Sequence, residues 1–78
     1  MEAKAFIQER NSRKNMILII GDNEYGMYPI DNIETSEKSL EMMFSDAKDY
    51  NIDHIKIDNT YWNNPRSLHI YLNLKNII

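Results

Sequence analysis

The apolar run MILII, which begins at Met16, constrains the fold more than any other segment of this chain. Its β-branched and apolar side chains favour a strand, and successive residues of a strand point to opposite faces of a sheet. Met16, Leu18 and Ile20 are therefore expected on one face, with Ile17 and Ile19 on the other. Both sets are apolar, so each face of the sheet needs a cover at this strand.

The segments on either side of this run predict partner strands. AKAFIQER, residues 3–10, has helix-favouring residues, but its place before the polar NSRKN also suits the first arm of a hairpin, and strand is the preferred interpretation. GDNEYG, residues 21–26, is a cluster of turn residues and predicts a second hairpin connection. The strand after it carries Pro29, which cannot donate to a ladder and belongs at an edge or a strand end.

A helix is predicted from about Thr35 to Tyr50. Glu34 and Glu37 lie at the positive end of its dipole and Lys48 at the negative end. Asn51 suits the left-handed position that closes a helix. The helix would bury one apolar stripe at helical spacing, namely Leu40, Met43, Phe44 and Ala47.

Two alternating segments follow, HIKIDNT from His54 and SLHIYLNL from Ser67, and both read as strands. Paired as a hairpin, they satisfy one register, with Ile55 opposite Leu72 inside and Asp58 opposite His69 outside. The residues left over are YWNNPR, so we expect this stretch to form the tip of the hairpin.

Together these segments predict an α+β domain over residues 1–78, with the order β-β-β-α-β-β. The expected architecture is a small, mostly antiparallel sheet with one amphipathic helix on one face. A single helix cannot cover both faces. The set Met16, Leu18 and Ile20 would then be covered by the first segment as a helix, by a second copy of the chain, or by another protein.

Composition narrows the class of protein. The chain has no cysteine, so disulfides and thiolate zinc sites are excluded and a reducing compartment is expected. No apolar run approaches the roughly 20 residues that span a bilayer, and we expect a cytoplasmic protein. Amino acids with AT-rich codons dominate, which is typical of a low-GC bacterium or a phage.

Charge is divided unevenly along the chain. Residues 22–58 hold ten acidic residues and three lysines, net −7, whereas the remainder holds two acidic and six basic residues, net +4. Glu34, Glu37 and Glu41 lead into and along the predicted helix. They form either a solvated helix face or a surface that competes for a basic site on a nucleic-acid-binding partner.

No catalytic, metal-binding or cofactor-binding residues are expected. GDNEYG lacks the lysine and glycine spacing of a phosphate loop and the alternating acids of a calcium loop. His54 and His69 would share an outward face, but at roughly 13 Å they are too far apart to hold one metal ion. The pairing of His69 with Asp58 is expected to be a surface contact. No nucleophile has a visible base, so we do not expect an enzyme.

The predicted tip offers the best candidate binding site. Trp, Tyr and Arg are enriched at binding hot spots, and a polar loop stiffened by proline docks at low entropy cost. Alternatively, Trp62 folds back to cap the core beside Phe44 or Tyr50. The candidate partner-binding residues are Tyr61, Trp62, Asn63, Asn64 and Arg66 of the tip, with Glu34, Glu37 and Glu41 of the helix.

The sequence therefore favours a non-catalytic module that binds a larger protein. The expected role is that of an inhibitor or modulator of a nuclease or another nucleic-acid-handling enzyme, of the phage or mobile-element type. Two alternatives remain open. One is a binder of single-stranded nucleic acid that uses the aromatic and arginine residues of the tip. The other is a structural homodimer that buries Met16, Leu18 and Ile20.

Overall fold

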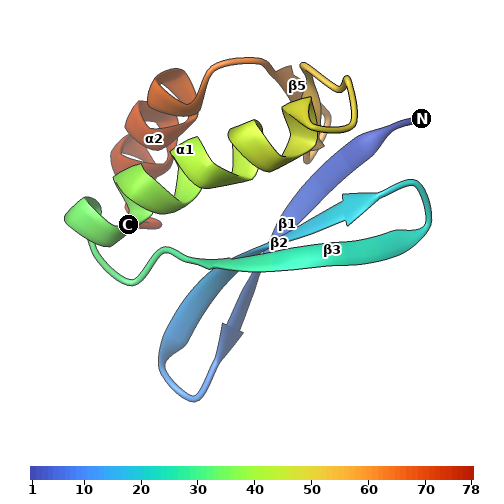
Figure 1. The fold of residues 1–78 in the computed structure, drawn as a ribbon. Helices are drawn as coiled ribbons and strands as arrows, with labels where there is room; N and C mark the ends of the chain where they lie inside the picture. Colours follow the sequence, from blue (N-terminus) through green and yellow to red (C-terminus); the bar gives the residue numbers. More distant parts are fainter.

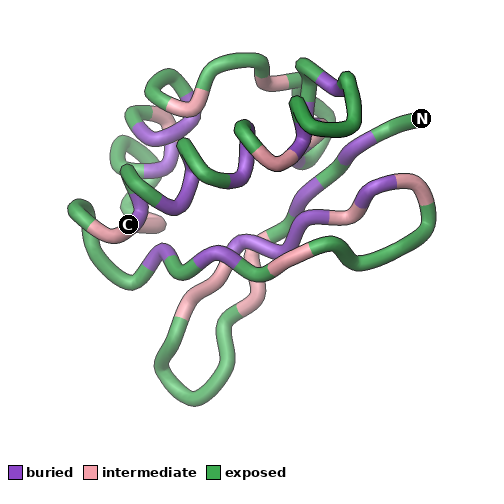
Figure 2. Tube along the Cα trace, in the orientation of Figure 1, coloured by how far each residue is buried: buried purple, intermediate pink, exposed green.

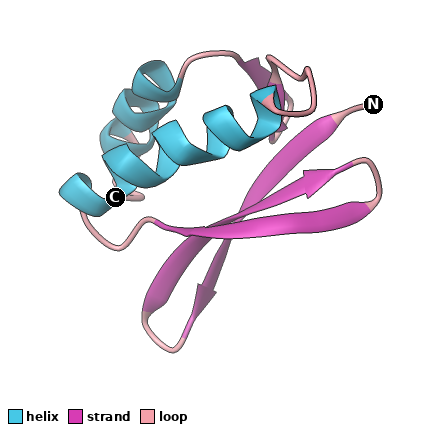
Figure 3. Ribbon diagram, viewed as in Figure 1, coloured by secondary structure: helices cyan, strands magenta, loops and turns pink.

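The computed structural model describes residues 1–78 as five strands and two helices (Figure 1, Figure 3). The elements in chain order are β1 (Ala3–Arg10), β2 (Arg13–Ile20), β3 (Asn23–Pro29), α1 (Ile33–Lys48), β4 (Ile55–Ile57), β5 (Thr60–Trp62) and α2 (Pro65–Leu74). The predicted α+β class is confirmed. The second helix was not predicted.

The strands form one sheet in the order β3-β2-β1-β4-β5. Three of its four neighbouring pairs are antiparallel, as predicted, while β1 and β4 run parallel, so the sheet is mixed. The parallel pairing places Ala3 beside Ile55 and Ala5 beside Ile57. It joins the first strand of the chain to the small β4–β5 hairpin that follows α1.

Tight turns connect the first three strands. Asn11 and Ser12 link β1 to β2 with φ angles of 54° and 64°, the conformation that a two-residue hairpin loop needs to match the twist of its strands. Gly21 has a φ of 64° in the turn between β2 and β3, where a glycine avoids the strain of a side chain. The predictions of a strand at 3–10 and of a hairpin connection at GDNEYG are confirmed, and Pro29 ends the edge strand β3.

Helix α1 forms where the apolar periodicity places it. The side chain of Asn32 caps its first turn by accepting a hydrogen bond of 2.8 Å from the backbone N–H of Thr35. Asn51 adopts the predicted left-handed conformation after the helix, with a φ of 61°. The predicted stripe of Leu40, Met43, Phe44 and Ala47 is buried.

The prediction of a strand at residues 67–74 is wrong, because this segment lies in helix α2. Asn64 is its N-cap, and the side-chain oxygen accepts hydrogen bonds from the backbone N–H groups of Arg66 and Ser67 at 2.9 and 3.1 Å. Pro65 follows at the first helical position, where its missing N–H costs nothing. The helix buries Leu68 and Leu72 at i and i+4, and not the alternating set that a strand would bury.

The predicted hairpin register is therefore also wrong. Strand β4 pairs with β5, so that Ile57 lies opposite Thr60 and Ile55 opposite Trp62. Asp58, with a φ of 55°, lies in the turn. YWNNPR consequently spans strand β5, a short connection and the start of α2, and it is not a hairpin tip.

Both helices lie on the same face of the sheet, while the β1–β2 hairpin extends beyond them (Figure 1). Sixteen buried residues form one cluster between the two layers. Met16, Leu18 and Ile20 belong to this cluster. The two helices of the same chain cover these three residues. A homodimer is therefore not needed to bury them. Burial is concentrated in the parts of the strands and helices that lie close to one another, and the end of the β1–β2 hairpin is exposed (Figure 2).

A hydrogen bond from Tyr28 links the edge strand β3 to helix α1. The hydroxyl of Tyr28, a residue that is 5% exposed, donates a hydrogen bond of 2.5 Å to Oδ2 of Asp46. Burial and this hydrogen bond to the carboxylate both raise the pKa of Tyr28 above its ordinary value of 10. Tyr25 of the same strand packs edge to face on Tyr50, with ring centroids 5.4 Å apart.

Candidate binding surface

The face of the sheet opposite the helices, here called the open sheet face, carries the side chains that alternate with the core positions. The strand registers identify them as Lys4, Phe6, Gln8 and Arg10 on β1, Arg13, Asn15, Ile17 and Ile19 on β2, Glu24, Met27 and Pro29 on β3, Lys56 on β4 and Tyr61 on β5. Neither helix covers this face.

An apolar row crosses the middle of the open sheet face. The registers place Phe6, Ile17 and Met27 side by side on β1, β2 and β3. Phe6 is 49% exposed and Met27 54%, whereas Ile17 between them is only 1% exposed. The two outer side chains therefore shield the inner one and remain in contact with water themselves, an arrangement that loses apolar burial unless a partner covers it.

Two lysines lie next to this row. Lys4 and Lys56 are direct partners across the parallel β1–β4 ladder, a position where like charges destabilise the sheet. Neither lysine forms an ion pair within 4.0 Å. The ion pairs of the chain are Arg13–Asp31 at 4.0 Å and Asp53–His54 at 2.9 Å. The ammonium of Lys56 instead lies 5.7 Å from the ring centroid of Tyr61.

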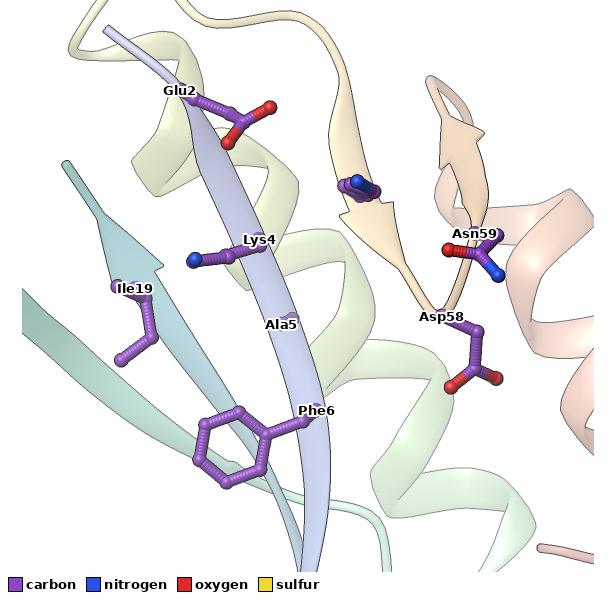
Figure 4. A pocket seen from close by; sticks show the side chains of 8 residues that line it. Glu2, Lys4, Ala5, Phe6, Ile19, Asp58 and Asn59 are labelled. Carbon is purple, nitrogen blue, oxygen red and sulfur yellow. The ribbon is translucent and has the colours of Figure 1, made fainter. Parts of the chain in front are cut away.

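A surface hollow of about 470 Å³ opens beside these lysines. Figure 4 shows Lys4 and Phe6 projecting from β1 toward β2, with Asp58 and Asn59 at the turn across the hollow. Glu2 lies at its margin and accepts a long hydrogen bond of 3.5 Å from the hydroxyl of Tyr61. The hollow is thus lined by one exposed aromatic ring, two cations and two carboxylates.

The structure separates the residues of the predicted tip. Tyr61 lies on the open sheet face and is 57% exposed. Trp62 points to the other side and packs against the core, 5.0 Å from Tyr71 between ring centroids. Its indole Nε1 is buried without a hydrogen-bond partner. Trp62 therefore fits the alternative of a core cap, although its neighbour is Tyr71 of α2 and not Phe44 or Tyr50.

The other predicted residues lie in the helical layer. Asn63 is exposed in the connection, and Asn64 caps α2. Glu37, Glu41 and Arg66 line a small pocket of about 90 Å³ with Pro65, at the seam between α1 and α2. Glu34 lies in the first turn of α1. These acids are on the side of the molecule away from the open sheet face, so the predicted set does not form one surface.

The histidines are not neighbours on a sheet face, and the predicted contact between His69 and Asp58 is wrong. His69 is buried in α2, where its Nδ1 lies 3.4 Å from the hydroxyl of Ser36. Ser36 is itself 0% exposed and donates to the carbonyl of Ile33, so this serine and histidine pair is closed to a substrate. His54 is exposed beside Asp53. No three His, Asp or Glu side chains gather as a metal site would require.

Sequence reasoning missed the residues that make the open sheet face distinctive: Lys4, Phe6 and Lys56. The alternation of AKAFIQER carries the signal for the first two, because Ala3, Ala5 and Ile7 point one way and Lys4, Phe6, Gln8 and Arg10 the other. The approach of Lys56 depends on the parallel β1–β4 pairing. No local pattern indicates that pairing.

Fold and surface together define a small α+β domain with a two-helix layer on one face of a mixed sheet and an uncovered opposite face. No helix has the length and apolar character needed to cross a membrane. Comparison with protein-family models, with curated proteins and with solved structures finds no significant match to this chain.

Proposed function

We propose that the chain is a non-catalytic protein-binding module and that the open sheet face is its binding surface. The observation that supports this proposal is the exposed apolar row of Phe6 and Met27 over Ile17, which both helices leave uncovered. In the proposed role, the module binds to a larger protein and inhibits or modulates it. A nuclease or another nucleic-acid-handling enzyme is the proposed class of target, and a phage or mobile element the proposed source.

The composition of the face suits an interface. Binding surfaces combine an apolar and aromatic centre with a polar rim, and their cores are enriched in aromatic residues, methionine and arginine. Phe6 and Met27 supply such a centre with Ile17 between them, while Tyr61 lies on the opposite edge strand β5. Covering the exposed half of Phe6 or Met27 would contribute roughly 1 kcal/mol each, so the strength of binding depends on several such contacts together.

The non-catalytic part of the proposal rests on the positions of the reactive groups. The one serine hydroxyl beside a histidine, that of Ser36, is fully buried. His54 lies on the exposed chain beside Asp53, with no hydroxyl or amine of another residue bonded to it. General acid–base chemistry needs a positioned group within reach of a substrate, and these groups do not offer one.

Affinity capture with a matched pair of variants tests the proposal. Phe6→Thr removes an exposed aromatic from the open sheet face, whereas Met42→Gln changes a side chain on α1 that is 60% exposed. Immobilised native chain and Met42→Gln should retain the same host protein, identified by mass spectrometry, and Phe6→Thr should lose it. Thermal unfolding of all three confirms that each is folded. Equal capture by a folded Phe6→Thr would refute the assignment of the surface.

A further inference from the structure

The charges of the open sheet face differ from those of the rest of the chain. Ten side chains point outward from β1, β2, β4 and β5, and they include four cations, of which Arg13 lies 4.0 Å from Asp31. The ten are Lys4, Phe6, Gln8, Arg10, Arg13, Asn15, Ile17, Ile19, Lys56 and Tyr61. The carboxylate that points outward from the five strands is Glu24 of β3. Two further carboxylates, those of Glu2 and Asp58, line the same hollow as Lys4 and Lys56. The net charge of −3 therefore conceals a local cationic strip.

The pair of Lys4 and Lys56 is the centre of this strip. The two residues are register partners across the β1–β4 ladder, and neither has a carboxylate within ion-pair distance. The side chain of Lys4 extends toward β2 (Figure 4). An anion placed between them would remove the repulsion and gain two charge-assisted contacts. Apart from the contact of Lys56 with the ring of Tyr61, the pair forms no stabilising interaction within the chain, which favours an anionic partner.

Two exposed aromatic rings flank the lysines. Tyr61 lies directly opposite Lys56, and Phe6 is two residues along β1 from Lys4 on the same face. With about 4.8 Å between strands and about 3.3 Å per residue along a strand, Tyr61 and Phe6 are separated by a distance on the order of 12 Å. This spacing places the cations between two stacking surfaces. Amide and guanidinium groups, on Gln8 and Arg10, continue the strip along β1.

We infer that the open sheet face binds single-stranded nucleic acid, with bases stacked on Phe6 and Tyr61 and phosphates held by Lys4, Lys56 and Arg10. Aromatic platforms beside a cationic track are the means by which proteins hold single strands without strong sequence preference. The inference goes beyond the proposed function, because it assigns a nucleic acid, and not a protein, to the same face. An apolar protein surface would use Phe6 equally well, but it would leave the lysine pair without a counter-charge.

Fluorescence anisotropy of a labelled 12-nucleotide oligothymidylate, titrated with the full chain, tests this inference. Contacts to about three phosphates predict that the logarithm of the binding constant falls with the logarithm of salt concentration with a slope of about −2. Lys56→Gln should weaken binding about tenfold at low salt and reduce the slope. Phe6→Leu should weaken binding by a similar factor at every salt concentration and leave the slope unchanged, because it removes stacking and no charge.

Lys38→Gln is the matched control, since Lys38 is an exposed cation on α1. Binding that responds equally to Lys38→Gln and Lys56→Gln would overturn the inference, as would absence of binding at micromolar concentrations in low salt. Equal affinity for duplex DNA with no effect of Phe6→Leu would also overturn it. If the oligonucleotide does not bind and Phe6→Thr still loses a captured protein, the inference fails while the proposed function stands. If neither effect occurs, both fail.

Discussion

Replacement of Asn64 by alanine tests whether the last third of the chain is the helix that the structure contains or the hairpin that its alternation favours. In the structure, one side-chain oxygen accepts from two backbone N–H groups, those of Arg66 and Ser67, at 2.9 and 3.1 Å. Removing an asparagine N-cap costs about 0.5–2 kcal/mol. Because Asn64 is exposed and water can replace part of the lost bonding, we expect about 1 kcal/mol.

That loss converts into a measurable shift of the melting temperature. An unfolding entropy of about 2.1 cal/mol/K per residue gives roughly 160 cal/mol/K for a chain of this size. A loss of about 1 kcal/mol then lowers the melting temperature by about 6 °C. Thermal unfolding followed by far-ultraviolet circular dichroism detects this difference, and urea titration provides an independent free energy.

The neighbouring asparagine provides the control. Asn63 is exposed in the same connection, and its side chain makes no hydrogen bond within the chain. Asn63→Ala should therefore change stability by less than about 0.5 kcal/mol, and Asn64→Asp should retain most of the stability of the native chain. If Asn63→Ala and Asn64→Ala have the same small effect, Asn64 does not cap a helix and the reasoning is refuted.

Three further substitutions test the core and the edge strand. Tyr28→Phe should cost about 1–2 kcal/mol by removing the hydrogen bond to Asp46. Because the pKa of Tyr28 is raised in the folded state, its contribution to the free energy of unfolding is complete below pH 10 and is lost as the pH rises above 10. Urea titrations across that range should therefore show a smaller decline in stability for Tyr28→Phe than for the native chain. Leu68→Ala should lower the free energy of unfolding by about 2–5 kcal/mol because Leu68 is fully buried. Leu74→Ala, at a site that is 78% exposed, should lower it by less than about 0.5 kcal/mol. Equal losses of stability in denaturant titrations would contradict the packing of α2. Gly26→Ala would place a Cβ atom 2.9 Å from the hydroxyl of Tyr28, and we expect a loss of about 1–3 kcal/mol, with unchanged stability as the contrary result.

Local patterns predicted the elements of the first two thirds of the fold, and local forces determine the conformation of the helix and of the turns among them. The periodicity of residues 40–47 has one solution, a helix, and the turn residues around Gly21 and Asn51 require backbone conformations that few other residues adopt. The strand at residues 3–10 was predicted correctly from its position before a polar turn, against its own helix propensity. Tertiary pairing with β2 decides the conformation of that segment.

The last segment misled because its apolar residues satisfy two periods. Leu68, Ile70, Leu72 and Leu74 alternate as in a strand, while Leu68 and Leu72 alone satisfy the spacing of a helix. The structure buries the helical pair and leaves Ile70 half exposed. The deciding signal lay just upstream, in Asn64 followed by Pro65. This is the preferred order of an N-cap and a first helical residue, although the same dipeptide also suits a stiff loop.

The candidate site was harder to predict than the fold because its residues come together only through the pairing of strands that are distant in the sequence. A count along the chain assigns Lys4 to a basic end and Lys56 to an acidic middle, so the two lysines belong to segments of opposite net charge. The parallel β1–β4 pairing places them side by side, and helix α1 carries four of the ten acids of the middle segment to the other side of the molecule. The net charge of a sequence segment thus differs from the net charge of a face of the folded molecule. A binding partner contacts a face, so the charge of the face is the one that affects binding. An acidic protein can therefore present a cationic surface to an anionic partner while its helical layer repels that same partner, which would fix the orientation in which the two associate.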